Sequence, residues 1–213
     1  MTVDAGHIEA FIAAARRVAA CGLVRCSSGN LSWRVDDERM LVTASQAWMA
    51  DLAPRQVAVC RVADAEPLSA CRPSVESRFH AGVLRRREEM RAVLHCQSPA
   101  ATAIACCEPA GADFNVIVEV PFYIGPVATV PYLPPGSEEL ADAIVGAMAE
   151  HDMALLAHHG QVTVGRTLSD AIQRAAFFEL ACDILLRAGD RVRSLPPEAV
   201  AALRQTAHRP EGG

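Results

Sequence analysis

The stretch VLHCQSP at residues 93–99 decides how the rest of the chain is interpreted. Its apolar residues and the proline that closes it predict a short buried strand over residues 91–97. Side chains alternate between the two faces of a strand, so His95 and Gln97 point one way and the residues between them the other. A histidine and an amide just before a proline lie where a strand delivers groups to a cleft. The alternative is a satisfied core histidine beside a loop glutamine.

The length and charge of the chain bound its class. With 213 residues, we expect a single α/β domain over residues 1–193, followed by a C-terminal tail over residues 194–213. The formal net charge of −5 gives no support for nucleic-acid binding. No apolar run of about 18 residues is free of charge, so we expect no membrane span. The first residues lack a basic start followed by an apolar core, which predicts no secretory signal and a cytoplasmic protein.

Two features of the composition limit the chemistry. The eight cysteines are scattered without a C-x-x-C pair, which excludes a zinc ribbon or a thioredoxin-like motif and favours reduced thiols. All 20 basic residues are Arg, so Schiff-base catalysis by a lysine is excluded. Carbanion chemistry in this chain must therefore use a metal or another electrophile.

Hydrophobic periodicity predicts a mixture of helices and strands. We expect helices over residues 6–21, 99–107 and 169–188 and after Ser74 and Ser137, and strands over residues 40–44, 57–62, 116–120, 127–130, 153–159 and 161–164. Ser74 is the expected N-cap of its helix, with Glu76 in the first turn. Residues 26–34 are expected to form a loop whose hydroxyl and amide donors can cradle an anion. The alternative for that loop is an ordinary Ser/Gly turn.

Five short motifs occur in order along the chain. They are SSGNLS at residues 27–32, TAS at 43–45, PSVESRFH at 73–80, LHCQSP at 94–99 and HHG at 158–160. Together they resemble the class II aldolase/adducin family over residues 8–188. The resemblance implies an α/β/α domain with a central mixed, largely antiparallel sheet. It also implies a homotetramer, often with active sites at subunit boundaries, that acts on a small-molecule substrate of carbohydrate metabolism.

The resemblance also assigns candidate site residues. Aldolases of the family hold Zn²⁺ with three histidines, two from an H-x-H strand and one from the later H-G turn. By position, His95 matches the first ligand, His159 the third, and Glu76 the carboxylate that serves as acid and base and can also reach the metal. The positions that bind phosphate in the family match Ser27, Gly29, Asn30, Ser45 and Ser74.

The chain departs from the family pattern at three positions. Gln97 replaces the second histidine of H-x-H, Val75 replaces the second serine of P-S-S-E, and Gln46 replaces a glycine. An amide oxygen at Gln97 can still bind a metal, but Zn²⁺ prefers imidazole and thiolate, so a harder ion such as Mn²⁺ or Co²⁺ becomes possible. Cys96 is a poor substitute because it faces away from His95. Val75 and Gln46 weaken the anion cradle, which leaves the phosphorylation of the substrate open.

These residues predict a metal-dependent lyase that cleaves a C–C bond in a small sugar-derived or sugar-phosphate hydroxy-carbonyl compound. The metal, held by His95, His159 and Gln97, is expected to stabilise the enediolate left by cleavage. Glu76 is expected to move the proton at carbon if burial raises its pKa. The family's epimerases have Asp at this position, so Glu76 favours cleavage. A tyrosine often donates a proton to the leaving group, and Tyr123 and Tyr132 are both candidates.

Two other functions remain open. A dehydratase or decarboxylase of the same superfamily would use the same metal enolate, and the weakened anion cradle favours it. A carboxylate substrate would then require an arginine such as Arg25, Arg34 or Arg78 near the site. The third possibility is a non-catalytic, adducin-like interaction domain whose metal site has decayed, and Gln97 motivates it.

Overall fold

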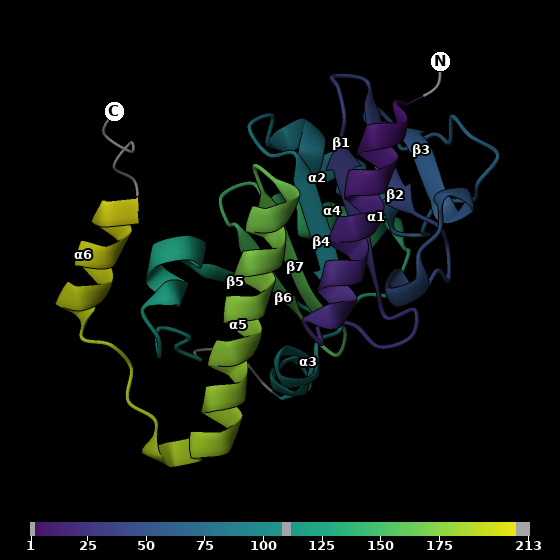
Figure 1. The fold of residues 1–213 in the computed structure, drawn as a ribbon. Helices are drawn as coiled ribbons and strands as arrows, with labels where there is room; N and C mark the ends of the chain where they lie inside the picture. The colour runs from purple at the N-terminus through teal and green to yellow at the C-terminus, as the bar shows by residue number, and fades with distance from the viewer. Residues whose placement is uncertain (1–2, 108–111, 208–213) are drawn as a thin grey trace.

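A mixed sheet forms the centre of the computed structural model, which describes residues 3–107 and 112–207 (Figure 1). The seven strands are β1 (Gly29–Arg34), β2 (Arg39–Thr43), β3 (Val57–Arg61), β4 (Ala92–Cys96), β5 (Val127–Val130), β6 (Met153–Leu156) and β7 (Gly160–Gly165). Their order across the sheet is β3-β2-β1-β4-β7-β6-β5. Among these strands only β5 and β6 pair in parallel. The predicted α/β fold with a largely antiparallel sheet is confirmed, and β4 lies at its centre.

Helices cover both faces of this sheet. They are α1 (Ala5–Ala20), α2 (Ser77–Arg86), α3 (Pro99–Ala105), α4 (Glu138–Ala147), α5 (Leu168–Ala188) and α6 (Pro197–Ala207). Short helical segments are η1 (Met49–Asp51), η2 (Pro54–Gln56), the π-helical η3 (Val120–Ile124) and η4 (Gly189–Arg191). In Figure 1, α1 and α5 lie in front of the sheet, and α2 and α4 lie behind it. The sheet is therefore the middle layer of three.

The two faces of β4 belong to different hydrophobic layers. Val93 is buried with Phe79 of α2 and Ile144 of α4. Leu94 and Cys96 are buried with α1 and α5. The predicted alternation along this strand is confirmed, and each fully buried apolar side chain contributes about 1.5–3 kcal/mol to holding the layers together.

The start of α2 differs from the prediction. The helix begins at Ser77, and Glu76 rather than Ser74 occupies its N-cap position. The cause is a contact with β2, because the amide of Ser74 donates to the carbonyl of Thr43 at 3.0 Å and keeps the chain extended. The hydroxyl of Ser74 accepts instead from the amide of Glu76 at 3.3 Å. Glu76 thus precedes the helix rather than lying in its first turn.

Three other predicted boundaries were wrong. Residues 29–34, expected in a loop, form β1 because they pair along both β2 and β4. Residues 116–120, expected as a strand, form turns that lead into η3, where Pro121 cannot donate to a ladder. The strand expected over residues 153–159 ends at Leu156, because the chain turns through His158 with a φ of 57°.

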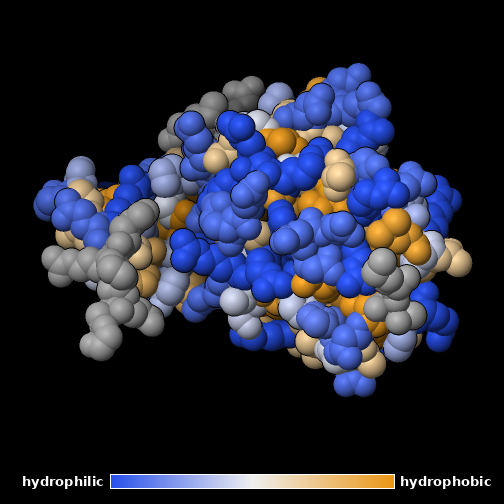
Figure 2. Space-filling model, turned by 90° about the horizontal axis from the view of Figure 1, so that it is seen from above, coloured by the Kyte–Doolittle hydropathy of each residue, from blue (hydrophilic) through white to orange (hydrophobic). Residues whose placement is uncertain are grey.

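The C-terminal tail expected over residues 194–213 contains a helix, α6, in its described part, and residues 208–213 lie outside the described residues. Helix α6 packs against η3, and Figure 1 shows it at the side of the molecule, away from the sheet. Figure 2 shows that the face seen from above is mainly hydrophilic, with apolar residues in small separate patches, as expected for a surface in water. None of the helices in the described residues has the length and apolar character needed to cross a bilayer.

Candidate active site

A polar cavity of about 410 Å³ opens beside the end of β4. Every residue assigned to the site from the sequence lines it, namely Ser27, Gly29, Asn30, Ser45, Ser74, Glu76, His95, Gln97 and His159. These residues come from five separate motifs, so the sheet topology rather than local sequence brings them together. Whether each has the function assigned to it remains a prediction.

Three potential metal ligands meet at this cavity. Ligand atoms of Glu76, His95 and His159 all lie within 4.8 Å of one another. Nε2 of His95 lies 3.7 Å from Oε2 of Glu76, and Nε2 of His159 lies 3.6 Å from Oε1. The three side chains are at most 10% exposed. One carboxylate and two imidazoles at this spacing are a donor set suited to a divalent transition metal.

His95 is fixed by the middle of the sheet. It pairs with Asn30 of β1 on one side and with Val162 of β7 on the other. Its Nδ1 lies 2.9 Å from the carbonyl oxygen of Gln161. A backbone carbonyl can only accept, so Nδ1 donates this bond and Nε2 faces Glu76. This is the arrangement that orients a metal-ligating histidine.

His159 reaches the cavity from the turn between β6 and β7. Gly160 has a φ of 148°, and a Cβ at that position would lie 2.6 Å from the carbonyl oxygen of Cys96. The glycine therefore lets the turn approach the end of β4 closely. Burial lowers the pKa of His159 to about 4, and repulsion from His95 adds to this against the attraction of Glu76. His159 is thus a neutral imidazole at pH 7.

Glu76 is ionised at neutral pH. Burial by itself raises its pKa, but attraction to His95, the hydrogen bond from Asn30 and attraction to His159 outweigh that effect and lower it. The condition that burial raises the pKa of Glu76 is therefore not met in this structure. Oε2 accepts from Nδ2 of Asn30 at 2.7 Å, whereas Oε1 is buried and has no hydrogen-bond partner among the described residues.

The unpartnered oxygen is evidence that the site fits a metal. A buried carboxylate oxygen without a hydrogen bond costs free energy unless a cation or a ligand donor compensates for it. Nδ1 of His159 is also buried without a hydrogen-bond partner in the described part of the chain. The donors of Glu76, His95 and His159 thus form a possible site for a divalent metal.

Gln97 lies at the cavity wall just beyond the last residue of β4. Its side chain is exposed, and its backbone N–H donates to the carbonyl of Ser28 at 3.0 Å. Cys96 is fully buried on the opposite face, where burial raises the pKa of its thiol strongly. The expectation that Cys96 cannot replace the missing histidine is supported by this orientation.

The residues of the predicted anion cradle line one cavity, with fewer polar groups than the motif resemblance implies. Ser27, Ser45 and Ser74 line the cavity, and α2 begins beside it. Val75 is 57% exposed where a second hydroxyl would lie. Gln46 has a φ of 61°, a conformation that a glycine adopts more easily. Asn30 is buried, and its side-chain amide already donates to Glu76.

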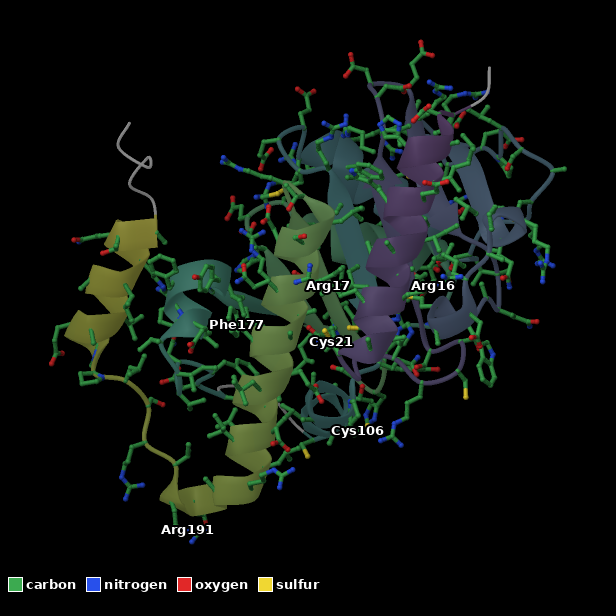
Figure 3. All side chains as sticks on the ribbon, in the orientation of Figure 1. Arg16, Arg17, Cys21, Cys106, Phe177 and Arg191 are labelled. Carbon is green, nitrogen blue, oxygen red and sulfur yellow. The ribbon has the colours of Figure 1, made fainter. Side chains whose placement is uncertain are left out.

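The two tyrosines lie in different places. Tyr132 lines the cavity, and its ring lies 6.4 Å from that of His158. Tyr123 stacks on Phe177 at a centroid distance of 5.2 Å. Figure 3 shows Phe177 between α5 and the segment that carries η3. Of the two candidates, only Tyr132 is positioned to meet a substrate in the cavity.

The arginines expected near a substrate carboxylate are directed elsewhere. Arg34 donates to the carbonyl of Leu84, and Arg78 pairs with Glu138. Arg25 is exposed and does not line the cavity. Among the lining residues that the structure describes, none is an arginine. An anionic end of a substrate would therefore meet hydroxyls and backbone amides rather than a guanidinium.

A family model described as the Class II Aldolase and Adducin N-terminal domain matches residues 9–186. The chain belongs to this family. The match covers all five motifs from which the resemblance was inferred, and it ends within the last turn of α5.

Relatives of this class II aldolase/adducin chain include several enzymes. The chain is 32% identical over 189 residues to the 3-oxo-tetronate 4-phosphate decarboxylase of Escherichia coli O6:H1, which covers 86% of this chain and 88% of the relative. It is 36% identical over 172 residues to the 5-methylthioribulose-1-phosphate/5-deoxyribulose-1-phosphate aldolase of Rhodospirillum rubrum, covering 79% and 75% of the two chains.

Solved structures of the family have the same fold. YgbL of Escherichia coli matches with a TM-score of 0.86 at 28% identity, covering 93% of this chain and 98% of that one. L-fuculose 1-phosphate aldolase matches with a TM-score of 0.81 at 22% identity, covering 96% and 97%. The second likeness supports the fold alone.

Sequence reasoning missed the buried polar residues behind the site. His80 lies within the PSVESRFH motif, but no role was assigned to it, and Ser32 lies within SSGNLS. Both are fully buried and linked to Asn30, as described below. Two signals in the sequence could have indicated them. A histidine follows Glu76 by four residues, about one helical turn, and polar residues occupy alternate positions 30 and 32.

Proposed function

We propose that this protein is a divalent-metal-dependent lyase that cleaves a C–C bond next to the carbonyl of a small sugar-derived hydroxy-carbonyl phosphate. The observation that carries the proposal is the buried cluster of Glu76, His95 and His159 in a polar cavity. The membership of the chain in the class II aldolase/adducin family and the names of its relatives support the same class of reaction.

We assign separate roles in metal binding and proton transfer to the residues of the site. His95 and His159 would hold the metal through Nε2, and Gln97 would offer its amide oxygen from the cavity wall. When bound, a divalent ion such as Zn²⁺, Mn²⁺ or Co²⁺ supplies Lewis-acid stabilisation of the negative charge that develops on the substrate oxygens. Glu76, ionised and with Oε1 free, would take up the proton that the substrate hydroxyl loses on cleavage and deliver it to the carbon of the enediolate. Tyr132 lines the same cavity and is positioned to contact that hydroxyl.

The remaining polar residues of the cavity would bind the anionic end of the substrate. Ser27, Gly29, Asn30, Ser45 and Ser74 are the proposed substrate-binding residues. The N-terminus of α2 adds a favourable dipole for an anion. The relatives named above act on phosphorylated compounds according to their names. These points favour a phosphate despite the loss of a hydroxyl at Val75.

A decarboxylase is the second candidate function. The relative from Escherichia coli O6:H1 is named for decarboxylation of a 3-oxo acid phosphate. Loss of carbon dioxide next to a carbonyl leaves the same kind of carbanion as aldol cleavage, so the same metal and the same Glu76 can serve it. Decarboxylation needs no base to deprotonate a substrate hydroxyl and no arginine to retain the carboxylate, which suits a cavity whose described lining lacks arginine.

The setting of the enzyme is also a proposal. We propose a homotetramer with no nucleic-acid or membrane partner, working in the cytoplasm. The homotetramer follows from the family alone. The net charge of −5 argues against a nucleic-acid partner, and the eight free cysteines, all among the described residues, favour a reducing compartment. Light scattering should give a mass close to four times the 22.7 kDa of one chain.

The test begins with elemental metal analysis of purified native protein, His95→Ala and His159→Ala. We expect about one metal per chain in the native protein and a loss of metal in both variants. Turnover should then be sought with 5-deoxyribulose 1-phosphate for aldol cleavage and 3-oxo-tetronate 4-phosphate for decarboxylation, with Glu76→Gln as the inactive control. A native protein that binds no Zn²⁺, Mn²⁺ or Co²⁺ would remove the lyase proposal and leave a non-catalytic, adducin-like role.

A further inference from the structure

A buried chain of polar side chains ends on Glu76. Oγ of Ser32 lies 2.7 Å from Nδ1 of His80, and Nε2 of His80 lies 2.5 Å from Oδ1 of Asn30. Nδ2 of Asn30 donates to Oε2 of Glu76 at 2.7 Å. Ser32 and His80 are 0% exposed, and Asn30 and Glu76 are 7% and 6% exposed. The inner members of this chain therefore cannot act on a substrate directly.

The sheet and α2 together create this chain. Asn30 and Ser32 are two residues apart on β1 and point to the same face. They pair across the ladder with His95 and Val93 of β4, so Asn30 lies directly beside a proposed metal ligand. His80 reaches the same face from α2, four residues after Glu76.

The hydrogen bond from Nδ2 of Asn30 to Oε2 of Glu76 fixes the protons in the rest of the chain. With its NH₂ toward Glu76, Asn30 turns its carbonyl oxygen toward His80, where that oxygen can only accept. Nε2 of His80 must then carry the proton, and Nδ1 accepts from the hydroxyl of Ser32. Each group has one orientation that satisfies both of its neighbours. A group that cannot donate at position 80 would release Asn30 to rotate.

The carboxylate of Glu76 has little else to hold it. The residue occupies the N-cap position of α2 and makes no capping hydrogen bond with its side chain. Its other oxygen, Oε1, is the one without a partner, and it lies 3.6 Å from His159. The orientation of the carboxylate therefore depends on Asn30, and through Asn30 on His80.

We propose that Ser32, His80 and Asn30 are positioning residues that hold Oε2 of Glu76 and leave Oε1 directed at the metal and the reacting carbon. This inference rests on the proposed function of Glu76. It gives Asn30 a role in orienting the carboxylate, in addition to the substrate binding proposed for it. A change at His80, which touches neither metal nor substrate, should then alter the metal site.

The test compares His80→Phe, which keeps a planar ring but no donor, with His80→Gln, which keeps an N–H able to reach Asn30. His151→Phe is a matched control, because His151 does not line the cavity and its ring nitrogen Nδ1 is bonded to the carbonyl of Ala147. Ser32→Ala is a milder variant that removes only the outermost hydroxyl, and it serves if His80→Phe does not fold.

The first measurement uses metal-free protein. The chain has only two asparagines, Asn30 and Asn115, so ¹⁵N-asparagine labelling gives two side-chain NH₂ pairs. We expect slow hydrogen exchange for the Asn30 pair in native protein, fast exchange in His80→Phe, and recovery in His80→Gln. The pair of Asn115, bonded to Asp113, serves as the internal reference.

The second measurement is Co²⁺ affinity by competition with a chelator. Changes behind a metal ligand typically cost about 10- to 100-fold in metal affinity or activity, so we expect a loss in that range for His80→Phe. His80→Gln should recover most of it, and His151→Phe should match native protein. In turnover assays the loss should fall on kcat rather than on KM.

Unchanged exchange of the Asn30 pair and unchanged Co²⁺ affinity in folded His80→Phe would overturn the inference. Equal losses in His80→Phe and His80→Gln would also overturn it, because they would indicate packing rather than hydrogen bonding. The amide exchange needs no metal and no turnover. Native protein that binds no metal would thus refute the proposed function, while the exchange data would still decide the role of His80.

Discussion

A single amide distinguishes this candidate metal site from the H-x-H pattern that the motif resemblance implies. Gln97 lines the cavity with an exposed side chain, two residues after His95. A flexible neutral amide is a weaker Zn²⁺ ligand than an imidazole. The identity of residue 97 should therefore determine how tightly and how selectively the site binds metal.

We predict that Gln97→His raises Zn²⁺ affinity at least tenfold, because it supplies a third imidazole at the cavity wall. Chelator competition measures the dissociation constant, and Gln97→Ala is the matched control. Equal affinity in native protein and Gln97→His would show that residue 97 does not reach the metal.

His80 should also make the stability of the protein depend on pH. Burial lowers its pKa to about 3, with repulsion from His95 adding to burial and attraction to Glu76 opposing it. An unfolded histidine titrates near about 6.5, so between these values the unfolded chain binds more protons. The contribution of neutral His80 to the free energy of unfolding is fully present above the pKa of the unfolded chain, and it is lost as the pH falls toward 3.

We predict that the free energy of unfolding decreases between pH 7 and pH 5, and that His80 contributes at most about 1.4 kcal/mol per pH unit. His80→Gln should have a shallower slope by about one proton, while His159 contributes equally in both proteins. Urea unfolding at several pH values measures the slopes. Parallel slopes would mean that His80 is protonated in the folded state.

At the scale of elements, two glycines flank the end of β4. A Cβ at Gly29 of β1 would lie 2.6 Å from the carbonyl oxygen of His95, and one at Gly160 would lie 2.6 Å from that of Cys96. The strands on both sides can therefore approach the site closely only where the side chain is absent.

We predict that Gly160→Ala both destabilises the protein and weakens metal binding, because the new methyl group must push the β6–β7 turn and His159 away from β4. The expected loss of unfolding free energy is about 1–3 kcal/mol. Gly146→Ala in α4 is the control, since a Cβ there meets no atom within 4 Å. Native Co²⁺ affinity in Gly160→Ala would refute the close-approach argument.

The sequence predicts the helices, the strands and the candidate metal-binding residues better than it predicts the contacts between distant segments. The alternation of β4 and the ends of α1 and α5 follow from local pattern, and motif resemblance was enough to choose Glu76, His95 and His159. The start of α2 could not be predicted, because it depends on the contact of Ser74 with β2. The chain from Ser32 to Glu76 depends on the register of β1 against β4, which no local signal specifies.

At the scale of the whole molecule, one aspartate joins the two helical layers. Asp152, just before β6, pairs with Arg87 at the end of α2 at 2.9 Å and with Arg174 of α5 at 2.8 Å. The three side chains are 16% to 22% exposed. The two arginines lie on opposite sides of the sheet, so Asp152 links the layers past the end of β6.

We predict that Asp152→Asn lowers the free energy of unfolding by about 1–3 kcal/mol, because both guanidinium groups lose a charged acceptor in a half-buried place. Asp64→Asn, which breaks a pair with Arg61 at 44% and 50% exposure, should cost less than about 1 kcal/mol. Urea titration compares the two. Similar losses would show that Asp152 is no more important than a surface pair.

The donors Glu76, His95 and His159 belong to segments that meet only after the central strands have paired. An ion held by all three has no equivalent binding site on the unfolded chain. Free metal at about 100 times its dissociation constant would then add about 2.7 kcal/mol to the folded state. Metal supply would therefore regulate how long the protein survives proteolysis, and a chelator would shorten its lifetime without touching any other part of the fold.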